Sequence, residues 1–420
     1  MKRREFIALL TAVVGAPGVA LSQTLTQTTR IDSWSATNDR VFLGGDVWAN
    51  PMEDWRVDGG WAACQTSGRG RNIHSLLHEL TDAGKPFTIS VEVQRPDGLA
   101  KDGGAGLRLG ISADIDDHRA ACFANNGINA GLQGDTLMLG KARQKLPAGS
   151  PSHYVLMLVG KPVGDEAELT LSVADPKLGK PIASVTESFP VNKLRGNFAL
   201  ASQFSGDNGR PNSPGYRFRD WRISGDAFMH HADRAFGPIL WSMYSLSDNR
   251  DDDGFVMKLT ALLGPLGELD NKTVGLEVKR EGKWQAVATA ELDTDAWTAT
   301  FRLPNWNEKQ SVPYRVVYRE EGTGGAAAEH VYHGTIRANP TKPLRIGALT
   351  CQNAVGFPYK PVSDNLVNLD TDLLFFSGDQ LYENHGGFGV IRKPADLAIL
   401  NYLRKFYMFG WAFREAMANA

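Results

Sequence analysis

Alternation of apolar and polar residues dominates the first half of the chain. Residues 87–93 read Phe-Thr-Ile-Ser-Val-Glu-Val, and residues 107–111 and 167–173 keep the same two-residue period. Successive side chains of a strand point to opposite faces, so this pattern predicts strands with one buried and one wet face. Glycine-rich stretches such as 206–209 supply the positive-φ positions that chain reversals need. Residues 23–228 are therefore predicted to form an all-β sandwich.

The end of this block resembles the final strands of concanavalin-like domains. Residues 197–202 and 218–225 carry the likeness, which implies a lectin-like jelly roll, a fold that often binds glycans. Trp48, Trp55 and Trp61 are the candidates for stacking on sugar rings, although tryptophan in a sandwich more often belongs to the core. No glycan site is assigned to them.

Residues 229–340 are predicted to form a second, immunoglobulin-like β-sandwich, because their length suits one such domain. Its candidate strands are residues 257–261, 274–278, 297–301 and 314–318. Pro340 and Pro343 end the pattern, since proline is excluded from the middle of a sheet.

After these prolines the pattern changes to strand, crossover, strand and helix, as at the start of an α/β domain over residues 341–420. Residues 344–350 predict a strand, and Ser363 is expected to cap a short helix. Residues 373–377 are continuously apolar, which is typical of a parallel strand covered on both faces. Two strands joined by a crossover of about twenty residues are predicted to be parallel neighbours.

This arrangement brings a candidate metal site to the carboxyl edge of the two strands, where α/β sheets place their ligands. Cys351 follows the first strand and Asp379 the second, with Tyr382 three residues further on. Thiolate and phenolate are strong donors to Fe³⁺, and a carboxylate can bridge two cations. A lone cysteine at a strand end is more often a small buried hydrophobe. The joint pattern with Glu383 is what indicates a site.

The motifs around these residues resemble the opening motifs of the PhoD-like alkaline phosphatases, a branch of the calcineurin-like metallophosphoesterases. The motifs are residues 349–353, 361–366 and 376–383, and residues 402–415 resemble the helix that follows them in that family. Residues 229–340 resemble the amino-terminal β-sandwich of the family more loosely. The resemblance implies that Cys351 and Tyr382 are ligands of a ferric ion and that Asp379 bridges to a second ion, Ca²⁺. The implied reaction is hydrolysis of phosphate mono- or diesters by a metal-bound hydroxide.

The sequence departs from the family pattern after this helix. Family members continue with an Asp/Asn-His-Asp type motif and further Asp and His ligands, which the residues up to Ala420 do not contain. The phosphoesterase domain is therefore expected to be incomplete and inactive alone. One face of the last helix is expected to find no sheet to pack on, because two strands cannot close a layered core. That face comprises Leu397, Leu400, Leu403, Tyr407 and Trp411.

The amino terminus predicts export. Basic residues, the apolar run 6–14 and small residues before Gln23 form the three zones of a signal peptide over residues 1–22. Arg3-Arg4-Glu5-Phe6-Ile7 fits the twin-arginine pattern, with an ordinary secretory signal as the alternative. We expect a periplasmic or extracellular protein that uses the twin-arginine machinery. No later apolar run reaches the ~18 residues of a membrane span.

Composition adds limits on partners. Apolar residues make up 42% and charged residues 22% of the 420 residues, which suits globular domains with sizeable cores. A net charge of −2 gives no electrostatic reason to expect nucleic acid, and three cysteines are too few for a disulfide framework. The expected partner is a phosphate ester. The alternative function is an exported protein that binds glycans or the cell envelope, with a vestigial phosphoesterase domain.

Overall fold

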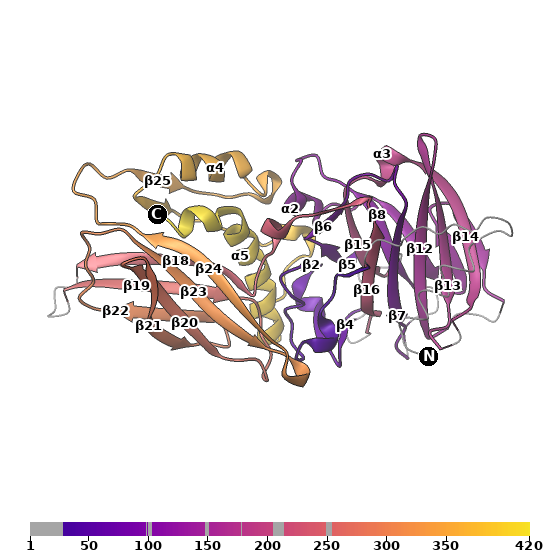
Figure 1. Ribbon diagram of the computed structural model, residues 1–420, viewed down its shortest axis with the longest axis horizontal. Helices are drawn as coiled ribbons and strands as arrows, with labels where there is room; N and C mark the ends of the chain where they lie inside the picture. The colour runs from indigo at the N-terminus through magenta and orange to yellow at the C-terminus, as the bar shows by residue number, and fades with distance from the viewer. Residues whose placement is uncertain are drawn as a thin grey trace. The chain divides into compact units, whose positions relative to one another are not determined.

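The computed structural model describes residues 28–97, 99, 103–147, 151–177, 179–204, 214–248 and 254–420. The chain divides into two compact units (Figure 1). The first unit comprises the residues up to Ser35, Asp46–Asn50 and Asp54–Ala235, and the second comprises Ala36–Gly45, Pro51–Glu53 and Phe236–Ala420. The predicted signal peptide lies outside the described residues.

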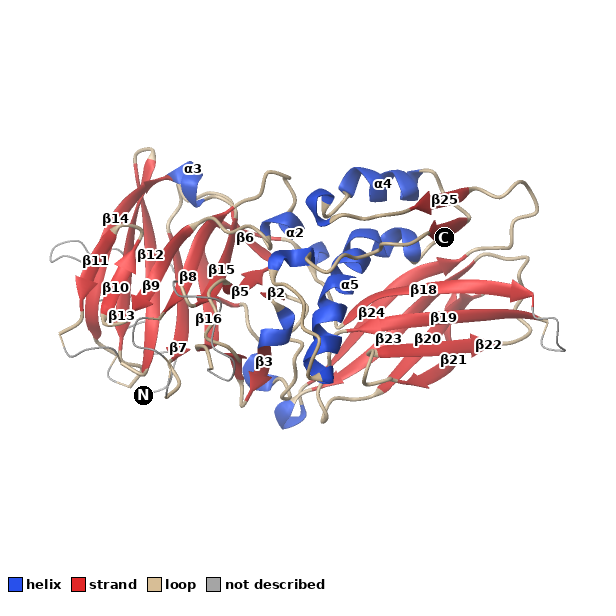
Figure 2. Ribbon diagram, turned by 180° about the vertical axis from the view of Figure 1, so that it is seen from behind, coloured by secondary structure: helices blue, strands red, loops and turns tan. Residues whose placement is uncertain are grey.

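The first unit contains two large antiparallel sheets (Figure 2). One sheet has the strand order β14-β13-β12-β7-β16-β4-β3, with β1 paired to β16, and the other has the order β11-β10-β9-β8-β15-β5-β2. The strands of the first sheet are β1 (Thr29–Arg30), β3 (Trp55–Asp58), β4 (Trp61–Cys64), β7 (Phe87–Gln94), β12 (His153–Val163), β13 (Glu166–Ala174), β14 (Pro181–Pro190) and β16 (Arg217–Gly225). Those of the second are β2 (Val47–Asn50), β5 (Arg71–Ser75), β8 (Gly104–Ile111), β9 (Ile128–Gln133), β10 (Thr136–Leu139), β11 (Ala142–Lys145) and β15 (Asn197–Ser202). Shorter elements are the pair β6 (His78–Leu80) and β17 (Phe228–His230), and the one-turn helices α2 (His118–Ala121) and α3 (Val191–Leu194).

The inward face of β7 follows the predicted alternation, but the prediction of a wet opposite face is wrong for this strand, because Ser90 and Glu92 are buried as well and Glu92 pairs with Arg219. Ile89, Val91 and Val93 of β7 are fully shielded from water, as expected for the inward face of a strand. The predicted strands at 87–93, 107–111 and 167–173 are confirmed as parts of β7, β8 and β13. The sandwich itself is thus confirmed, and the closer likeness to concanavalin-like domains stays a prediction.

The second unit begins with a smaller antiparallel sandwich. Its two sheets have the orders β18-β19-β22 and β21-β20-β23-β24. The strands are β18 (Ile239–Asp248), β19 (Phe255–Leu263), β20 (Thr273–Arg280), β21 (Lys283–Glu291), β22 (Thr298–Leu303), β23 (Val312–Glu321) and β24 (Ala327–Ile336). The strands predicted within residues 257–261, 274–278, 297–301 and 314–318 are confirmed as β19, β20, β22 and β23, with shifted ends.

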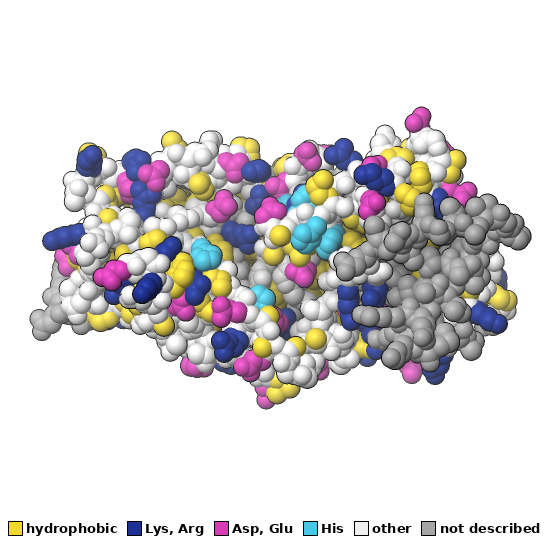
Figure 3. Space-filling model, in the orientation of Figure 1, with side chains coloured by type: hydrophobic (Ala, Val, Ile, Leu, Met, Phe, Trp, Pro, Cys, Tyr) yellow, Lys and Arg dark blue, Asp and Glu magenta, His cyan; other side chains and the backbone are white. Residues whose placement is uncertain are grey.

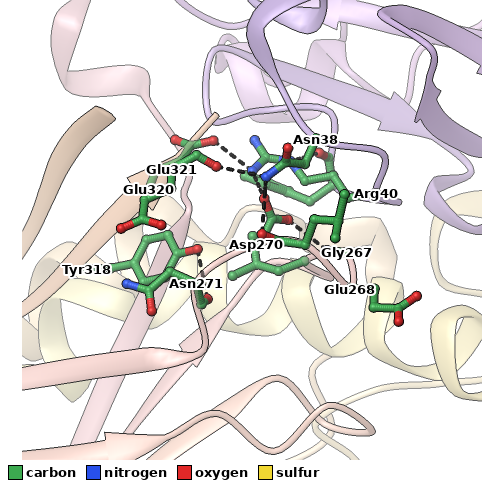
Figure 4. Close-up of polar contacts among 12 residues, drawn as sticks. Asn38, Arg40, Gly267, Glu268, Asp270, Asn271, Tyr318, Glu320 and Glu321 are labelled. Carbon is green, nitrogen blue, oxygen red and sulfur yellow. Dashed lines mark hydrogen bonds and ion pairs between the residues drawn. The ribbon is translucent and has the colours of Figure 1, made fainter. Parts of the chain in front are cut away.

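A buried charged cluster ties residues 36–45 to this sandwich (Figure 4). Arg40 Nη1 lies 2.6 Å from Glu320 Oε1 and 3.6 Å from Asp270 Oδ1. Asn38 Nδ2 donates to Asp270 Oδ1 over 3.1 Å. The side chains of Arg40 and Asp270 are nearly inaccessible to water, so each charge depends on its partners for compensation.

Acid is expected to loosen this cluster through Glu320. A hydrogen bond to His330, reinforced by the charge of Arg40, lowers the pKa of Glu320 from 4.5 to about 2. The folded pKa lies below the unfolded value, so the ionised carboxylate stabilises the unit above pH 4.5 and this contribution is lost as the pH falls from 4.5 through 2. Urea denaturation across this window should show a shallower pH dependence in Glu320→Gln than in the wild type. Equal slopes would contradict this account of the cluster.

The remainder of the second unit contains a parallel strand pair and a long helix. Its elements are β25 (Ile346–Leu349), η5 (Ala354–Gly356), α4 (Lys360–Asn368), β26 (Leu373–Phe376), η6 (His385–Gly387) and α5 (Ala395–Met417). β25 and β26 pair in parallel, with Leu349 opposite Phe376, which confirms the predicted pairing. The expected cap at Ser363 is wrong, because α4 already begins at Lys360. Pro361 fits the first turn, where its missing N–H is not needed.

The β25–β26 pair is covered on one face only by the described residues. Ile346, Leu373 and Phe375 are 54%, 45% and 55% exposed. The prediction that residues 373–377 are buried on both faces is therefore wrong. Helix α5 packs on the face of the strand pair that carries Phe376. The ring centroid of Phe376 lies 4.9 Å from that of Phe409 in α5.

Helix α5 packs against β18 of the second sandwich (Figure 2), so the expectation that its apolar face finds no sheet is wrong. The ring of Trp241 lies 5.5 Å from Phe406 and 6.0 Å from Tyr407. Trp411 stacks on Phe236 with a centroid distance of 4.8 Å. Leu400, Leu403, Tyr407 and Trp411 are all buried, and Leu397 is partly buried. A neighbouring β-sandwich thus supplies the cover that the two parallel strands cannot.

The small net charge of −2 and the low number of cysteines are reflected in the surface charges and in the state of the thiols. Acidic and basic side chains are intermixed on the face drawn in Figure 3. Cys64 and Cys122 are buried, Cys351 is exposed, and none of the three forms a disulfide. Among the described residues, no helix combines the length and apolar character needed to cross a membrane.

Candidate metal site at the ends of β25 and β26

The parallel strands deliver Cys351 and Asp379 to the same edge of the pair. Both residues adopt left-handed backbone conformations, with φ of 57° and 50°, two and three residues after their strands end at Leu349 and Phe376. Such values are uncommon outside glycine and recur at functional sites. The Cys351 N–H donates to the Gly378 carbonyl over 3.4 Å, and the Gln352 N–H donates to the Asp379 carbonyl over 3.0 Å. These backbone bonds hold the two loops side by side.

The three side chains predicted as ligands meet at this edge. Cys351 Sγ lies 3.7 Å from Asp379 Oδ2. Hydrogen bonds raise the pKa of the Tyr382 phenol, because both partners favour its protonated form. The bond to Asp379 is the larger cause and the bond to Cys351 the smaller one. The structure therefore places a thiol, a carboxylate and a phenol around one point, while their role as ligands stays a prediction.

Two neighbouring residues refine the picture given by the sequence. Thr350 Oγ1 donates to the Ser377 carbonyl over 2.6 Å and lies 3.3 Å from Cys351 Sγ. Sequence reasoning missed Thr350, although a hydroxyl beside a candidate thiolate is a recognisable signal. Glu383, which the pattern grouped with the site, is 71% exposed and faces Arg392 instead.

The hydrogen-bonded spacing of the Cys351 and Asp379 side chains also suits two ligands of one ion. Sulfur and oxygen ligands held at about 2.3 and 2.1 Å from one ion, at a roughly tetrahedral angle, lie about 3.6 Å apart. The 3.7 Å between Cys351 Sγ and Asp379 Oδ2 is close to this value. Thiolate and phenolate donors suit Fe³⁺ better than Mg²⁺ or Ca²⁺.

Ligands for a second ion are not gathered in the same way. Within the ranges that the structure describes, no group of three or more His, Cys, Asp or Glu side chains is placed to hold a metal. The Cys351 site contributes only two side chains of these types, and its third donor is a phenol.

The tryptophans considered for sugar stacking do not present open faces. Trp55 is fully buried and Trp48 is 6% exposed, so both belong to the core. The guanidinium of Arg219 lies 4.0 Å from the ring centroid of Trp61, which is itself 8% exposed. These positions give no support to a glycan site.

Comparisons with known proteins give no family for the chain. No family model matches it, and no curated protein matches it. Among solved structures, lectin UEA-II complexed with galactose is 9% identical, covering 47% of this chain and 98% of its own, with a TM-score of 0.33. Lectin II from Ulex europaeus is 10% identical over 49% of this chain and 99% of its own, with a TM-score of 0.31. A GH2 beta-galacturonidase from Eisenbergiella tayi is 12% identical over 93% of this chain and 58% of its own, with a TM-score of 0.18. These low TM-scores give the likenesses no weight for fold or function.

Proposed function

We propose that the second unit carries the ferric site of a metal-dependent hydrolase of phosphate mono- or diesters. One observation carries the proposal: Cys351, Asp379 and Tyr382 converge from two parallel strand ends. The donor set is chemically matched to Fe³⁺. The resemblance of the surrounding motifs to PhoD-like alkaline phosphatases supports the same assignment.

Each residue has a distinct part in this proposal. Cys351 and Tyr382 supply two anionic donors that offset the charge of a trivalent ion. Asp379 directs Oδ2 toward the thiol, and its carboxylate can also reach a second cation, proposed to be Ca²⁺. A bound ion would act as a Lewis acid on the phosphoryl group and lower the pKa of a bound water. Since the described residues gather no group of three or more His, Cys, Asp or Glu side chains for a second ion, iron binding by Cys351, Asp379 and Tyr382 is the property that we propose to test first.

We further propose that the protein is exported. The twin-arginine pattern within residues 1–22 supports export in a folded state. Such a route suits a protein that acquires its metal before crossing the membrane. The expected location is the periplasm or the cell exterior.

Loading the purified chain with Fe³⁺ tests the proposal directly. We expect a visible absorption band from tyrosinate-to-iron charge transfer, and we expect Tyr382→Phe to lose it. Tyr402→Phe, at a 54% exposed position of α5, is the matched control and should keep the band. A wild-type chain without the band, or a Tyr382→Phe variant that retains it, would refute the ferric site.

A further inference from the structure

A buried ion pair joins α5 to η2 (Met52–Asp54), next to the loop that carries Tyr382. Arg404 Nε of α5 donates to Glu53 Oε2 over 3.0 Å, and the two side chains are 0% and 1% exposed. The other carboxylate oxygen, Oε1, accepts from Asn401 Nδ2 over 2.6 Å. Glu53 belongs to η2 and is 351 positions from Arg404 in sequence. A segment near the start of the chain thus completes the surroundings of α5 inside the second unit.

The same arginine holds the loop that follows β26. Arg404 Nη1 donates to the backbone carbonyl of His385 over 2.8 Å. The buried ring of His385 lies 5.6 Å from the ring of Tyr382. A continuous path of contacts therefore runs from Glu53 through Arg404 and His385 to the loop that carries Tyr382.

Taking the charges of Arg404 and Glu53 out of water costs free energy. The pair therefore calls for a role that apolar side chains could not fill. Buried ion pairs are often replaceable by hydrophobic residues without loss of stability. The planar fork of arginine can reach a carboxylate and a carbonyl at once, whereas the single ammonium of lysine cannot span both. Arg404 uses this property to connect a fixed counterion to the loop that carries Tyr382.

We infer that Arg404 is a positioning residue for Tyr382, acting through His385 and anchored by Glu53. The inference rests on the proposed function, because it assigns the network to the ferric site. It also means that the site depends on residues 51–53 and would be damaged by excising the chain from residue 236 onward.

The full-length Arg404→Lys variant tests this inference, because lysine keeps the charge opposite Glu53 but loses the bond to His385. Without metal, amides of residues 379–389 should exchange hydrogen at least about tenfold faster than in the wild type, while those of β18 and β19 stay unchanged. With Fe³⁺, affinity should fall about 10- to 100-fold and the tyrosinate band should shift. Arg392→Lys is the matched control, because Arg392 is 77% exposed near the same loop, and it should change neither reading.

Unchanged loop exchange together with an unchanged band in Arg404→Lys would overturn the inference. A wild-type chain that shows no tyrosinate band would refute the proposed function. In that event the exchange measurement without metal still decides whether Arg404 orders the loop. If Arg404→Lys fails to fold, Glu53→Gln removes the anchoring charge with little change of shape and is read by the same two measurements.

Discussion

Asp379→Asn is expected to lower the affinity for Fe³⁺ by more than about 100-fold, since loss of a direct ligand should exceed the effect of losing an outer partner. The carboxylate interacts with both the Cys351 thiol and the Tyr382 phenol, so its charge is central to the donor set. Asparagine tolerates the left-handed backbone at this position, where φ is 50°. Loss of binding would then report on the carboxylate rather than on a distorted loop.

Affinity can be measured by titration against a competing chelator, with circular dichroism to confirm folding. Asp364→Asn is the matched control, because Asp364 is an exposed residue of α4 paired with Lys360 over 2.8 Å. It should bind iron as the wild type does. Wild-type affinity in Asp379→Asn would remove Asp379 from the site.

Gly410→Ala is expected to destabilise the second unit by about 2 kcal/mol, within the usual range for overpacking. A Cβ at Gly410 would lie 2.3–2.4 Å from three atoms of the six-membered ring of Trp241. In an exposed helix the same substitution would stabilise by about 1 kcal/mol. The sign of the change therefore tests whether α5 packs directly on β18.

A double-mutant cycle with Trp241→Phe sharpens this test. Phenylalanine removes part of the ring that the new methyl group would meet, so the penalty of Gly410→Ala should shrink in that background. Urea denaturation supplies the free energies of unfolding. Glu415→Ala, at an exposed position of α5, should stay within about 0.5 kcal/mol of the wild type. A stabilising Gly410→Ala, or an unchanged penalty beside Trp241→Phe, would contradict the packing described.

Local patterns were sufficient to predict much of the sandwich and the pairing of β25 with β26, although not the residues at which strands begin and end. The two-residue period at 87–93 fixes which side chains of β7 face inward, because register and face are linked in a strand. The length of the crossover predicted that the two strands are parallel neighbours, and β25 and β26 do pair in parallel. From that pairing alone, Cys351 and Asp379 were expected at one edge, and the structure places them there.

Contacts between distant elements could not be predicted from the sequence. The apolar spacing of α5 indicates a buried face but does not name its partner, which is β18. The pairing of Glu53 with Arg404 leaves no local signal, because the two residues belong to different elements far apart in the chain. The exposure of Leu373 and Phe375 likewise depends on which elements cover β26, not on its own composition.

Iron K-edge X-ray absorption on the Fe³⁺-loaded chain tests the central claim most directly. The account predicts one sulfur scatterer at about 2.3 Å, together with nearer oxygen scatterers. In Cys351→Ser the sulfur contribution should vanish while oxygen scatterers remain. A spectrum without sulfur in the wild type, or one that is unchanged in Cys351→Ser, would contradict the shared site of Cys351, Asp379 and Tyr382.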